Sequence, residues 1–459
     1  MAQLAQPNRI FLHGGVLLDP EAPAAAAGGV LVVDGRIAER RGAGAGAPGD
    51  ALCVDLAGRA LAPGFLDLHY HGALIFEAAD APPDALAQRL ARTAQRLLRD
   101  GVTGFLPTTV AWPAPELRAR VAALARACEA AGGSVLGLHL EGPWINPGAA
   151  GAQPRPGIRP FEVAEGAALL DCAESLVRMV TFAPEMAGAA ALQAELARRG
   201  IVAALGHSLA QAEQVARAVA GGASHVTHLF NAMGGIHHRA PGLAGTALAE
   251  DRLSCDLICD GLHVDPHMVR LAARAKGDGL ALITDRIELP AAAPGVAPAS
   301  SASGSAPAAS EPAAALAGFG SGALHDDGRA IWLRAATDST GVTGTGDAAS
   351  ARGTAPATPG APSAASAATP ATAAPAKLAG SSLSMDRAVR NAAAFGAMSQ
   401  LEAVAAATLR PARILGIESQ RGTLRPGARA DFAILNSAGV PVETWLVGRR
   451  AWSAQPQPD

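Results

Sequence analysis

Four side chains that could do chemistry stand where short apolar runs of the chain end. They are Glu141, His207, His228 and Asp285. A carboxylate and two imidazoles at the ends of successive strands could converge on one metal ion. A metal with a carboxylate base beside it hydrolyses amides, because the metal brings the pKa of a water towards 7 and the base takes its proton. The pattern predicts this chemistry, with Asp285 as the base.

A His-x-His pair, His69 and His71, follows residues 63–68, which are apolar except for Asp67. In a strand, residues two apart face the same side, so both imidazoles could point to one metal. Such a pair alone is weak support for metal binding. Together with ligands at other strand ends, it predicts that His69 and His71 are ligands as well.

Each of these residues also has a structural interpretation. Glu141 could be a solvated carboxylate at a strand end, and His207 and His228 could be core histidines that bond backbone carbonyls. Asp285 could cap a following helix. Because the three metal-ligand candidates occupy the same relative position on three strands, metal binding is the better hypothesis.

The elements that must position these residues alternate between strands and helices. Eight apolar runs are separated by segments with helical periodicity, such as Leu86, Leu90, Ala94 and Leu97. The runs are Leu61–His71, Val102–Val110, Val135–Glu141, Val177–Pro184, Ile201–His207, His225–Asn231, Leu253–His263 and Leu280–Asp285. Eight such units predict an α/β fold, a (β/α)₈ TIM-type barrel whose active site lies at the carboxyl ends of its strands.

Both flanks of the barrel have hairpin-like patterns, which predict a small β-sandwich domain built from the two termini. Residues 1–59 and 419–459 form this domain, residues 60–289 carry the barrel strands and the metal site, and residues 378–418 supply closing helices. Between the barrel strands and the closing helices, residues 290–377 are dominated by Ala, Pro, Ser, Gly and Thr. We expect most of this insertion to be disordered, with a hairpin near 323–333.

Composition narrows the class of protein further. The 459 residues are 49% hydrophobic, with a net charge of −3 and charges of both signs scattered along the chain. This argues against nucleic acid or a membrane as a partner. No signal peptide or membrane span is apparent in the sequence, and the five cysteines are too sparse for a disulfide framework. We therefore expect reduced thiols in the core and a cytoplasmic protein.

Beyond the individual residues, the chain resembles the N-acetylglucosamine-6-phosphate deacetylase family of the amidohydrolase superfamily. The matching segments are residues 63–67, 139–143, 206–208, 227–233, 260–265, 284–285, 378–386 and 427–431. The resemblance implies that Glu141, His207 and His228 hold a catalytic divalent metal and that Asp285 is the acid/base. Because His69 and His71 are retained, it also implies a second metal bridged by Glu141. We expect one or two ions per subunit, Zn²⁺ before Fe²⁺, Co²⁺ or Mn²⁺.

The resemblance also assigns substrate contacts. Asn231 and Ala232 would contact the sugar, whereas Arg239 and His263 would bind the 6-phosphate. In the family the arginine comes from the neighbouring subunit, which implies a homodimer. A guanidinium suits a phosphate, although from sequence alone a solvated loop charge would be the default interpretation of Arg239.

Two departures from the family pattern stand out. The family usually has a histidine twelve residues after the metal-binding glutamate, to bond the acetamide carbonyl, and this chain has Gln153, which donates a hydrogen bond without charge. Arg286-Ile287-Glu288 replaces a stretch of small residues after Asp285. The expected reaction is deacetylation of N-acetylglucosamine 6-phosphate. The alternatives are the galacto epimer, or a barrel that binds amino-sugar phosphates without catalysis.

Overall fold

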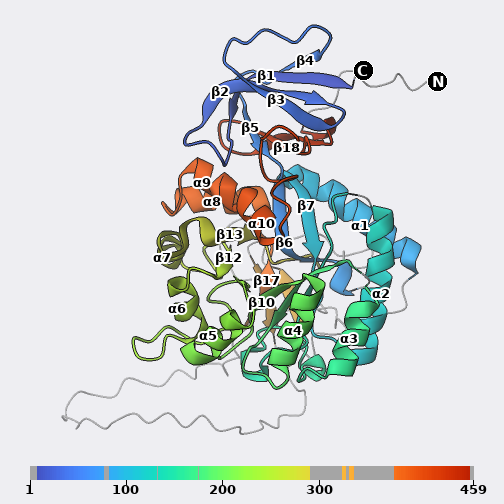
Figure 1. The fold of residues 1–459 in the computed structure, drawn as a ribbon, viewed down its shortest axis with the longest axis vertical. Coiled ribbons are helices and arrows are strands. Elements are labelled where there is room, and N and C mark those ends of the chain that lie inside the picture. Colours follow the sequence, from blue (N-terminus) through green and yellow to red (C-terminus); the bar gives the residue numbers. More distant parts are fainter. Residues whose placement is uncertain are drawn as a thin grey trace, which may run out of the picture.

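The computed structural model describes residues 8–76, 82–131, 133–173, 175–289, 323–326, 330–334 and 377–454. A barrel of strands and surrounding helices makes up most of the molecule, and a β domain lies at one end of it, at the top of Figure 1. The predicted fold class, a TIM-type barrel with a separate β domain, is confirmed.

Eight parallel strands of the described chain form the barrel, one from each apolar run. They are β6 (Phe65–Gly72), β7 (Val102–Pro107), β8 (Leu138–Glu141), β9 (Val177–Phe182), β10 (Val202–Leu205), β11 (His225–Val226), β12 (Ser254–Ile258) and β13 (Leu280–Ile283). Strands β8 to β13 are one continuous sheet, and β6 pairs with β7. The bridge Thr108–His139 links β7 to β8. On the other side β14 (Arg286–Ile287), which follows β13, pairs with β6, so the ring closes.

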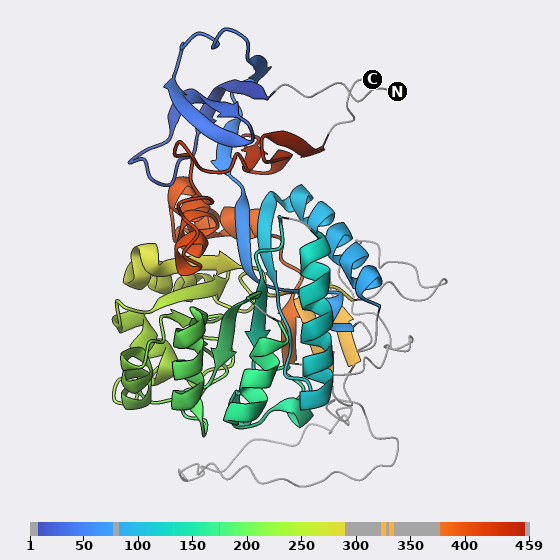
Figure 2. The same cartoon turned by 45° about the vertical axis from the view of Figure 1, so that its right-hand side comes forward.

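Helices surround these strands (Figures 1 and 2). They are α1 (Pro83–Leu97), α2 (Ala114–Ala131), α3 (Val163–Asp171), α4 (Ala189–Arg199), α5 (Ala212–Ala220), α6 (Gly242–Ala249), α7 (Pro266–Lys276), α8 (Met385–Ala394), α9 (Gln400–Ala406) and α10 (Leu409–Ile414). The periodic residues of α1, from Leu86 to Leu97, are buried as their spacing predicts. Helices α8 to α10 lie between the barrel and the β domain in Figure 1.

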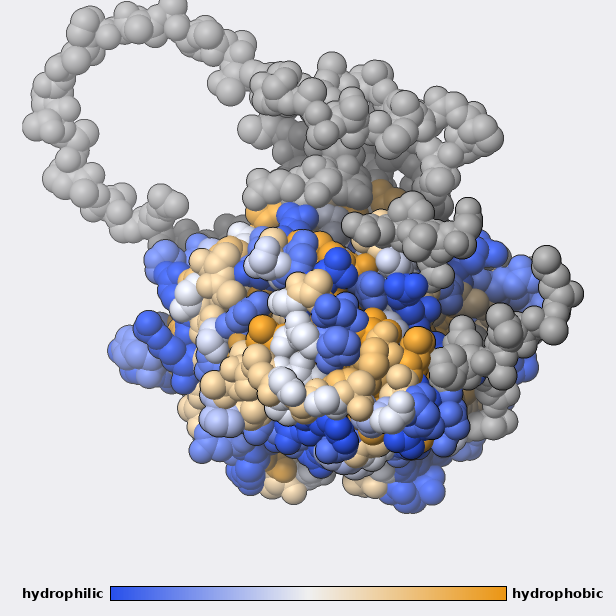
Figure 3. All heavy atoms as spheres, turned by 90° about the horizontal axis from the view of Figure 1, so that it is seen from above, coloured by the Kyte–Doolittle hydropathy of each residue, from blue (hydrophilic) through white to orange (hydrophobic). Residues whose placement is uncertain are grey.

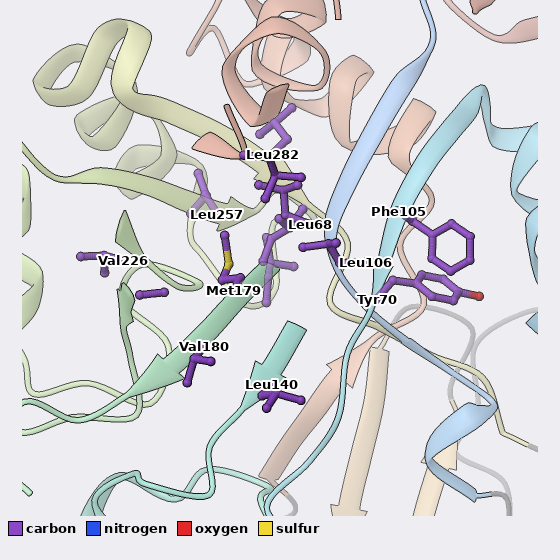
Figure 4. Close-up of a cluster of buried hydrophobic side chains, with 14 of the residues drawn as sticks. Leu68, Tyr70, Phe105, Leu106, Leu140, Met179, Val180, Val226, Leu257 and Leu282 are labelled. Carbon is purple, nitrogen blue, oxygen red and sulfur yellow. The ribbon is translucent and has the colours of Figure 1, made fainter. Parts of the chain in front are cut away.

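The barrel strands are buried on both faces, as expected for a parallel sheet covered by helices. Along β6 the side chains alternate, so that Asp67, His69 and His71 share one face and Leu68 and Tyr70 share the other. Figure 4 shows the apolar side chains packed between strands and helices. Burial of each large apolar side chain stabilises the fold by about 1.5–3 kcal/mol, which supplies the rigidity that a multi-strand site requires.

The β domain draws on both ends of the chain. Its strands are β1 (Arg9–Leu17), β2 (Ala26–Val33), β3 (Arg36–Gly42), β4 (Leu52–Asp55), β5 (Ala60–Pro63), β18 (Phe432–Leu435), β19 (Pro441–Leu446) and β20 (Arg449–Ser453). Their order is β20-β19-β18-β5-β1-β2-β3, with β4 also paired to β1. The antiparallel pairing of β18 with β5 joins the two ends. Buried residues such as Leu12, Phe432 and Trp445 form a separate core.

One strand of this domain is shorter than the sequence suggests. The hydrophobic pattern from Gly427 onward indicates a strand, but β18 begins only at Phe432. Gly427 has a left-handed φ of +90°, and the Asp431 carboxylate accepts hydrogen bonds from Arg421 at 2.7 Å and Arg429 at 3.0 Å. These side-chain bonds hold the segment in an irregular conformation.

Most of the Ala/Pro-rich insertion, and with it the predicted disorder, lies outside the described residues. Within it, β15 (Ala323–Asp326) and β16 (Ala330–Arg334) pair antiparallel, and β16 continues the sheet to β17 (Lys377–Ser381). β17 in turn pairs with β14, next to the strand ends of the barrel. The insertion therefore departs from and returns to the edge of the site.

The structure also shows the state of the cysteines and the character of the surface. All five cysteines are free thiols; Cys128, Cys255 and Cys259 are buried, but Cys53 is exposed rather than in the core. No helix among the described residues is long and apolar enough to cross a bilayer. The face seen in Figure 3 intersperses hydrophilic and hydrophobic residues.

Candidate metal centre

Glu141 and two histidines meet at the carboxyl ends of the barrel strands. Glu141 Oε1 lies 2.9 Å from His207 Nε2 and 2.8 Å from His228 Nε2, and these two nitrogens are 3.1 Å apart. All three side chains are buried. Two imidazole nitrogens and a carboxylate oxygen at such distances form a ligand set suited to a divalent metal.

A second group lies against the other oxygen of the same carboxylate. Glu141 Oε2 is 3.4 Å from His69 Nε2 and 3.2 Å from His71 Nε2. Asp285 Oδ1 is 3.4 Å and 3.3 Å from the same two nitrogens. His69, His71 and Asp285 thus form a second possible ligand set, with Glu141 between the two groups. The sequence indicated Asp285 as a base, and the structure adds that it faces this His pair.

The local backbone explains how residues from separate strands reach one point. Glu141 is the last residue of β8, whereas His207, His228 and Asp285 each lie two residues beyond the ends of β10, β11 and β13. These three residues have positive φ angles of 47°, 35° and 49°. Non-glycine residues adopt this conformation at a cost, and such strain is concentrated at functional sites. The turn redirects each side chain over the barrel mouth.

The buried charges of the site depend on one another. Burial alone would raise the pKa of Glu141, but His69 and His207 hold it well below its usual range. Burial would lower the pKa of His71, yet Asp285 and Glu141 raise it to about 10. In the same way, Glu141 outweighs burial and raises the pKa of His228 to about 9. Without a metal, positively charged imidazoles thus balance the two buried carboxylates, and a divalent cation would supply this charge once the imidazoles bind it in their neutral form.

Two of the imidazoles are oriented by carbonyls on their far side. His71 Nδ1 lies 3.1 Å from the Thr108 carbonyl oxygen, and His207 Nδ1 lies 2.9 Å from that of Ala149. An Nδ1–H that donates to a carbonyl leaves the Nε2 lone pair free to bind a metal. The arrangement of all the ligands therefore fits a divalent metal in geometry, and for His71 and His207 the far-side bonds also favour the metal-binding tautomer.

Beneath the metal ligands lies a polar layer that the sequence did not reveal. His139, two residues before Glu141 on the same face of β8, places Nδ1 3.0 Å from the Leu68 carbonyl oxygen and Nε2 2.8 Å from Thr181 Oγ1. Thr181 also bonds Thr227 at 2.6 Å. Burial and the neighbouring His69 hold the pKa of His139 well below its usual value, so this histidine is neutral. Because both of its ring nitrogens already have partners, it is a support rather than a ligand.

The fourth strand, which offered no obvious ligand in the sequence, contributes through its end. Glu185 accepts hydrogen bonds from Ser208 Oγ at 2.7 Å and from the Leu209 amide at 2.6 Å. It also accepts one from Asn146 at 2.8 Å. These bonds fix the turn directly after His207. No motif marked Glu185, because its partners come from other strands.

All the candidate metal ligands except His69 line a cavity that is also lined by the expected substrate residues Gln153, Asn231, Ala232 and His263. Asn231 Nδ2 is buried without a hydrogen-bond partner in the described structure, and His263 Nδ1 is fixed by Asp260 Oδ2 at 2.7 Å. Arg239 is exposed and lies outside the described lining of this cavity. Its guanidinium is 2.8 Å from His238 Nε2.

Gln153, the first departure from the family pattern, is held at both ends of its amide. Its Oε1 accepts the Ala111 N–H at 2.8 Å, and its Nε2 donates to Glu141 Oε2 at 2.5 Å. Its amide N–H₂ therefore borders both the metal ligands and the cavity. One of its two N–H groups donates to Glu141, and the other is free to donate a hydrogen bond to a substrate carbonyl.

The residues of the second departure, Arg286-Ile287-Glu288, have two different roles: the charged residues form ion pairs, and the isoleucine lines the cavity. Arg286 pairs with Asp100 at 3.1 Å, and Glu288 forms an ion pair with Arg96 and accepts a hydrogen bond from Tyr70. Only Ile287 lines the cavity. The two charged residues thus tie β14 to α1 and β6 and leave an apolar side chain toward the site.

Comparison with known proteins places this geometry in context. The model of the amidohydrolase family matches residues 60–451. The chain is 33% identical over 455 residues to N-acetylglucosamine-6-phosphate deacetylase from Homo sapiens, covering 97% of this chain and 91% of that protein. It is 31% identical over 393 residues to N-acetylgalactosamine-6-phosphate deacetylase from Escherichia coli O157:H7, covering 85% and 87%.

Solved structures are similar to the chain as well. A mutant of N-acetyl-D-glucosamine-6-phosphate deacetylase from Mycobacterium smegmatis, in complex with N-acetyl-D-glucosamine-6-phosphate, matches with a TM-score of 0.72 and 26% identity. The match covers 97% of this chain and 100% of that one. The similarity therefore extends over both the barrel and the β domain.

Proposed function

The chain belongs to the amidohydrolase family, and from this premise we propose that it hydrolyses the acetamide of N-acetylglucosamine 6-phosphate, giving glucosamine 6-phosphate and acetate in amino-sugar catabolism. The observation that carries the proposal is the position of Glu141, with His207 and His228 on one oxygen and the His69–His71 pair, faced by Asp285, on the other. This arrangement places a base within reach of a metal-activated water.

Each group of the site has a distinct task in this reaction. A divalent metal, when bound, polarises the acetamide carbonyl and lowers the pKa of the attacking water. Asp285 takes the proton of that water and later donates it to the leaving nitrogen. Burial would raise the pKa of Asp285, but His69 and His71 lower it, so the carboxylate is ionised and ready to accept a proton. The free Gln153 N–H donates to the carbonyl oxygen.

Recognition of the substrate uses the wall of the cavity and a second subunit. Asn231 and Ala232 contact the sugar, and the unpaired Asn231 amide supports this role. His263 binds the phosphate with the nitrogen that Asp260 leaves free. We assign Arg239 to the site of the neighbouring subunit in a homodimer, which is compatible with its exposure in the isolated chain.

The metal is Zn²⁺ in this proposal, because four imidazoles and two carboxylates are the ligands that zinc binds in hydrolases. The two ligand sets would hold two ions per subunit, and Glu141 could contribute one oxygen to each. The five free thiols support a cytoplasmic location.

The Escherichia coli relative favours one alternative, the galacto epimer of the substrate. Acetate release from both epimers, measured on one metal-quantified sample, tests the proposal. We expect a higher kcat/KM for the gluco epimer. Faster turnover of the galacto epimer would support the alternative, and absence of acetate release from both by metal-loaded protein would favour a non-catalytic binding barrel.

A further inference from the structure

His225 and Asp256 form a fully buried polar pair that no step of the proposed reaction uses. His225 begins β11 and Asp256 lies within the neighbouring β12. His225 Nε2 and Asp256 Oδ2 are 2.9 Å apart, and neither side chain is exposed to solvent. Burial of a carboxylate is costly unless hydrogen bonds compensate it. The hydrogen bonds of this pair therefore indicate what it does.

The bonds of Asp256 run to the segment that carries a metal ligand. Its Oδ1 accepts the backbone N–H of His228, and its own carbonyl oxygen accepts that of Leu229 at 2.9 Å. Two consecutive amides are thus held by one residue. His225 is fixed in turn, because its Nδ1 lies 2.8 Å from Ser254 Oγ while its Nε2 bonds Asp256.

His228 needs this support more than His71 or His207 does. Its Nδ1 is buried without a partner in the described structure, whereas the Nδ1 atoms of His71 and His207 meet carbonyl oxygens. His69, whose Nδ1 also lacks a partner among the described residues, is instead held by its position within β6. A metal-binding imidazole is usually oriented by such a bond. The direction of the His228 ring must come instead from its backbone, which has a strained φ of +35°.

We propose that the His225–Asp256 pair is a positioning device for His228. Asp256 stabilises the left-handed backbone of His228 and so directs His228 Nε2 toward Glu141 Oε1, and His225 keeps the Asp256 carboxylate in place. The inference rests on the proposed metal-dependent hydrolysis. It adds two positioning residues that contact neither the metal ligand atoms nor the substrate cavity.

The test is metal affinity, measured with Zn²⁺ by chelator competition on the purified full chain, together with the visible spectrum of the Co²⁺-loaded form. Asp256→Ala should lower the affinity for the ion held by Glu141, His207 and His228 by about tenfold to a hundredfold, as is typical for supporting partners of metal ligands. It should also change the Co²⁺ spectrum. Asp256→Asn keeps one acceptor oxygen and should lose less metal affinity. The affinity of His225→Phe should lie between those of the two Asp256 variants.

Asp431→Asn is the matched control, because Asp431 is a buried carboxylate paired with Arg421 at 2.7 Å, in the β domain. It should lower the thermal stability and leave metal affinity and the Co²⁺ spectrum unchanged. If Asp256→Ala does not fold, Asp256→Asn and His225→Phe decide the question. Metal affinity within about twofold of wild type in the folded variants, or an equal loss in Asp431→Asn, would overturn the positioning role. A wild-type protein that binds no metal would instead refute the proposed function.

Discussion

Thr284 and Asp67 join the eighth strand of the barrel to the first, directly beside the candidate base. Thr284 Oγ1 donates to Asp67 Oδ2 at 2.6 Å, and the Thr284 N–H donates to Oδ1 at 3.2 Å. Both side chains are buried. Asp285 follows Thr284, and His69 lies two residues after Asp67. This contact therefore helps to hold base and ligand together, beside the hydrogen bond that the Asp285 N–H donates to the His69 carbonyl oxygen at 2.9 Å.

Thr284→Val removes the shorter of these bonds and leaves a buried acceptor oxygen unpaired. We expect a loss of about 1–3 kcal/mol in the free energy of unfolding, measured by denaturant titration. Thr109→Val is the control, since the Thr109 hydroxyl is buried without a partner in the described structure and its replacement should cost little. Equal losses in both variants would contradict the role of the Asp67 contact.

Asp285→Asn should reduce turnover at least about a hundredfold, the scale of general acid–base catalysis. The ion at Glu141, His207 and His228 should remain, because Asp285 belongs to the other ligand set. Steady-state kinetics and metal analysis of one sample check both parts. Turnover close to wild type would rule out Asp285 as the base.

Glu141→Gln should lose metal and activity together, since Glu141 contacts both ligand sets. His207→Ala should do the same at its own set. Chelation of the wild type should likewise abolish activity, and Zn²⁺ should restore it. Full metal occupancy in either variant would mean that the ligand set is wrong.

Arg239→Ala should lower kcat/KM for the 6-phosphate at least about tenfold, because a charge-assisted contact to the phosphate is lost. Hydrolysis of the unphosphorylated N-acetyl sugar should change much less. Equal losses on the two substrates would make Arg239 a structural residue.

Mixed dimers test from which subunit Arg239 acts. In a hybrid of Arg239→Ala and Asp285→Asn chains, one site would combine an intact Asp285 with an intact Arg239 from the partner. Random re-association should then restore about a quarter of the wild-type activity. No recovery beyond the sum of the two separate variants would place Arg239 in its own subunit's site, or outside any site.

Deletion of the low-complexity residues on both sides of the 323–333 hairpin should leave the melting temperature nearly unchanged, because such segments bury little surface. Ile331→Ala should behave differently, since Ile331 is fully buried in β16 and its truncation costs about 2–5 kcal/mol. A thermal melt of both proteins makes the comparison. A large drop on deletion would show that the removed residues pack on the barrel.

The sequence predicted the barrel and the convergence of its polar strand ends because both follow from local patterns. Apolar runs mark the parallel strands, and all carboxyl ends of such strands lie at one mouth. Glu141, His207 and His228 could therefore be grouped without any coordinates. The positive φ angles that aim His207 and His228 at Glu141 have no comparable signal, because only a few per cent of non-glycine residues adopt positive φ and nothing in the sequence marks which ones.

The supporting residues were beyond prediction because their partners lie on other strands. His139 meets Thr181, and Glu185 meets Ser208, only through the register between neighbouring strands. Gln153 was expected to face the substrate, and its bond to Glu141 depends on the course of the loop after β8. A single sequence contains no periodicity that reports such contacts.

The pairing of β5 with β18 has a consequence for the order in which the molecule can be made. β5 leads directly into β6, which carries His69 and His71, yet its partner strand leaves the ribosome only after the whole barrel sequence. During translation the backbone groups at this edge of β5 have no partner strand, and an unpaired edge invites association with other chains. Completion of the β domain therefore has to wait until the whole barrel sequence has been synthesised. Chains that end before Leu435 should accumulate as aggregates even though they contain every metal ligand.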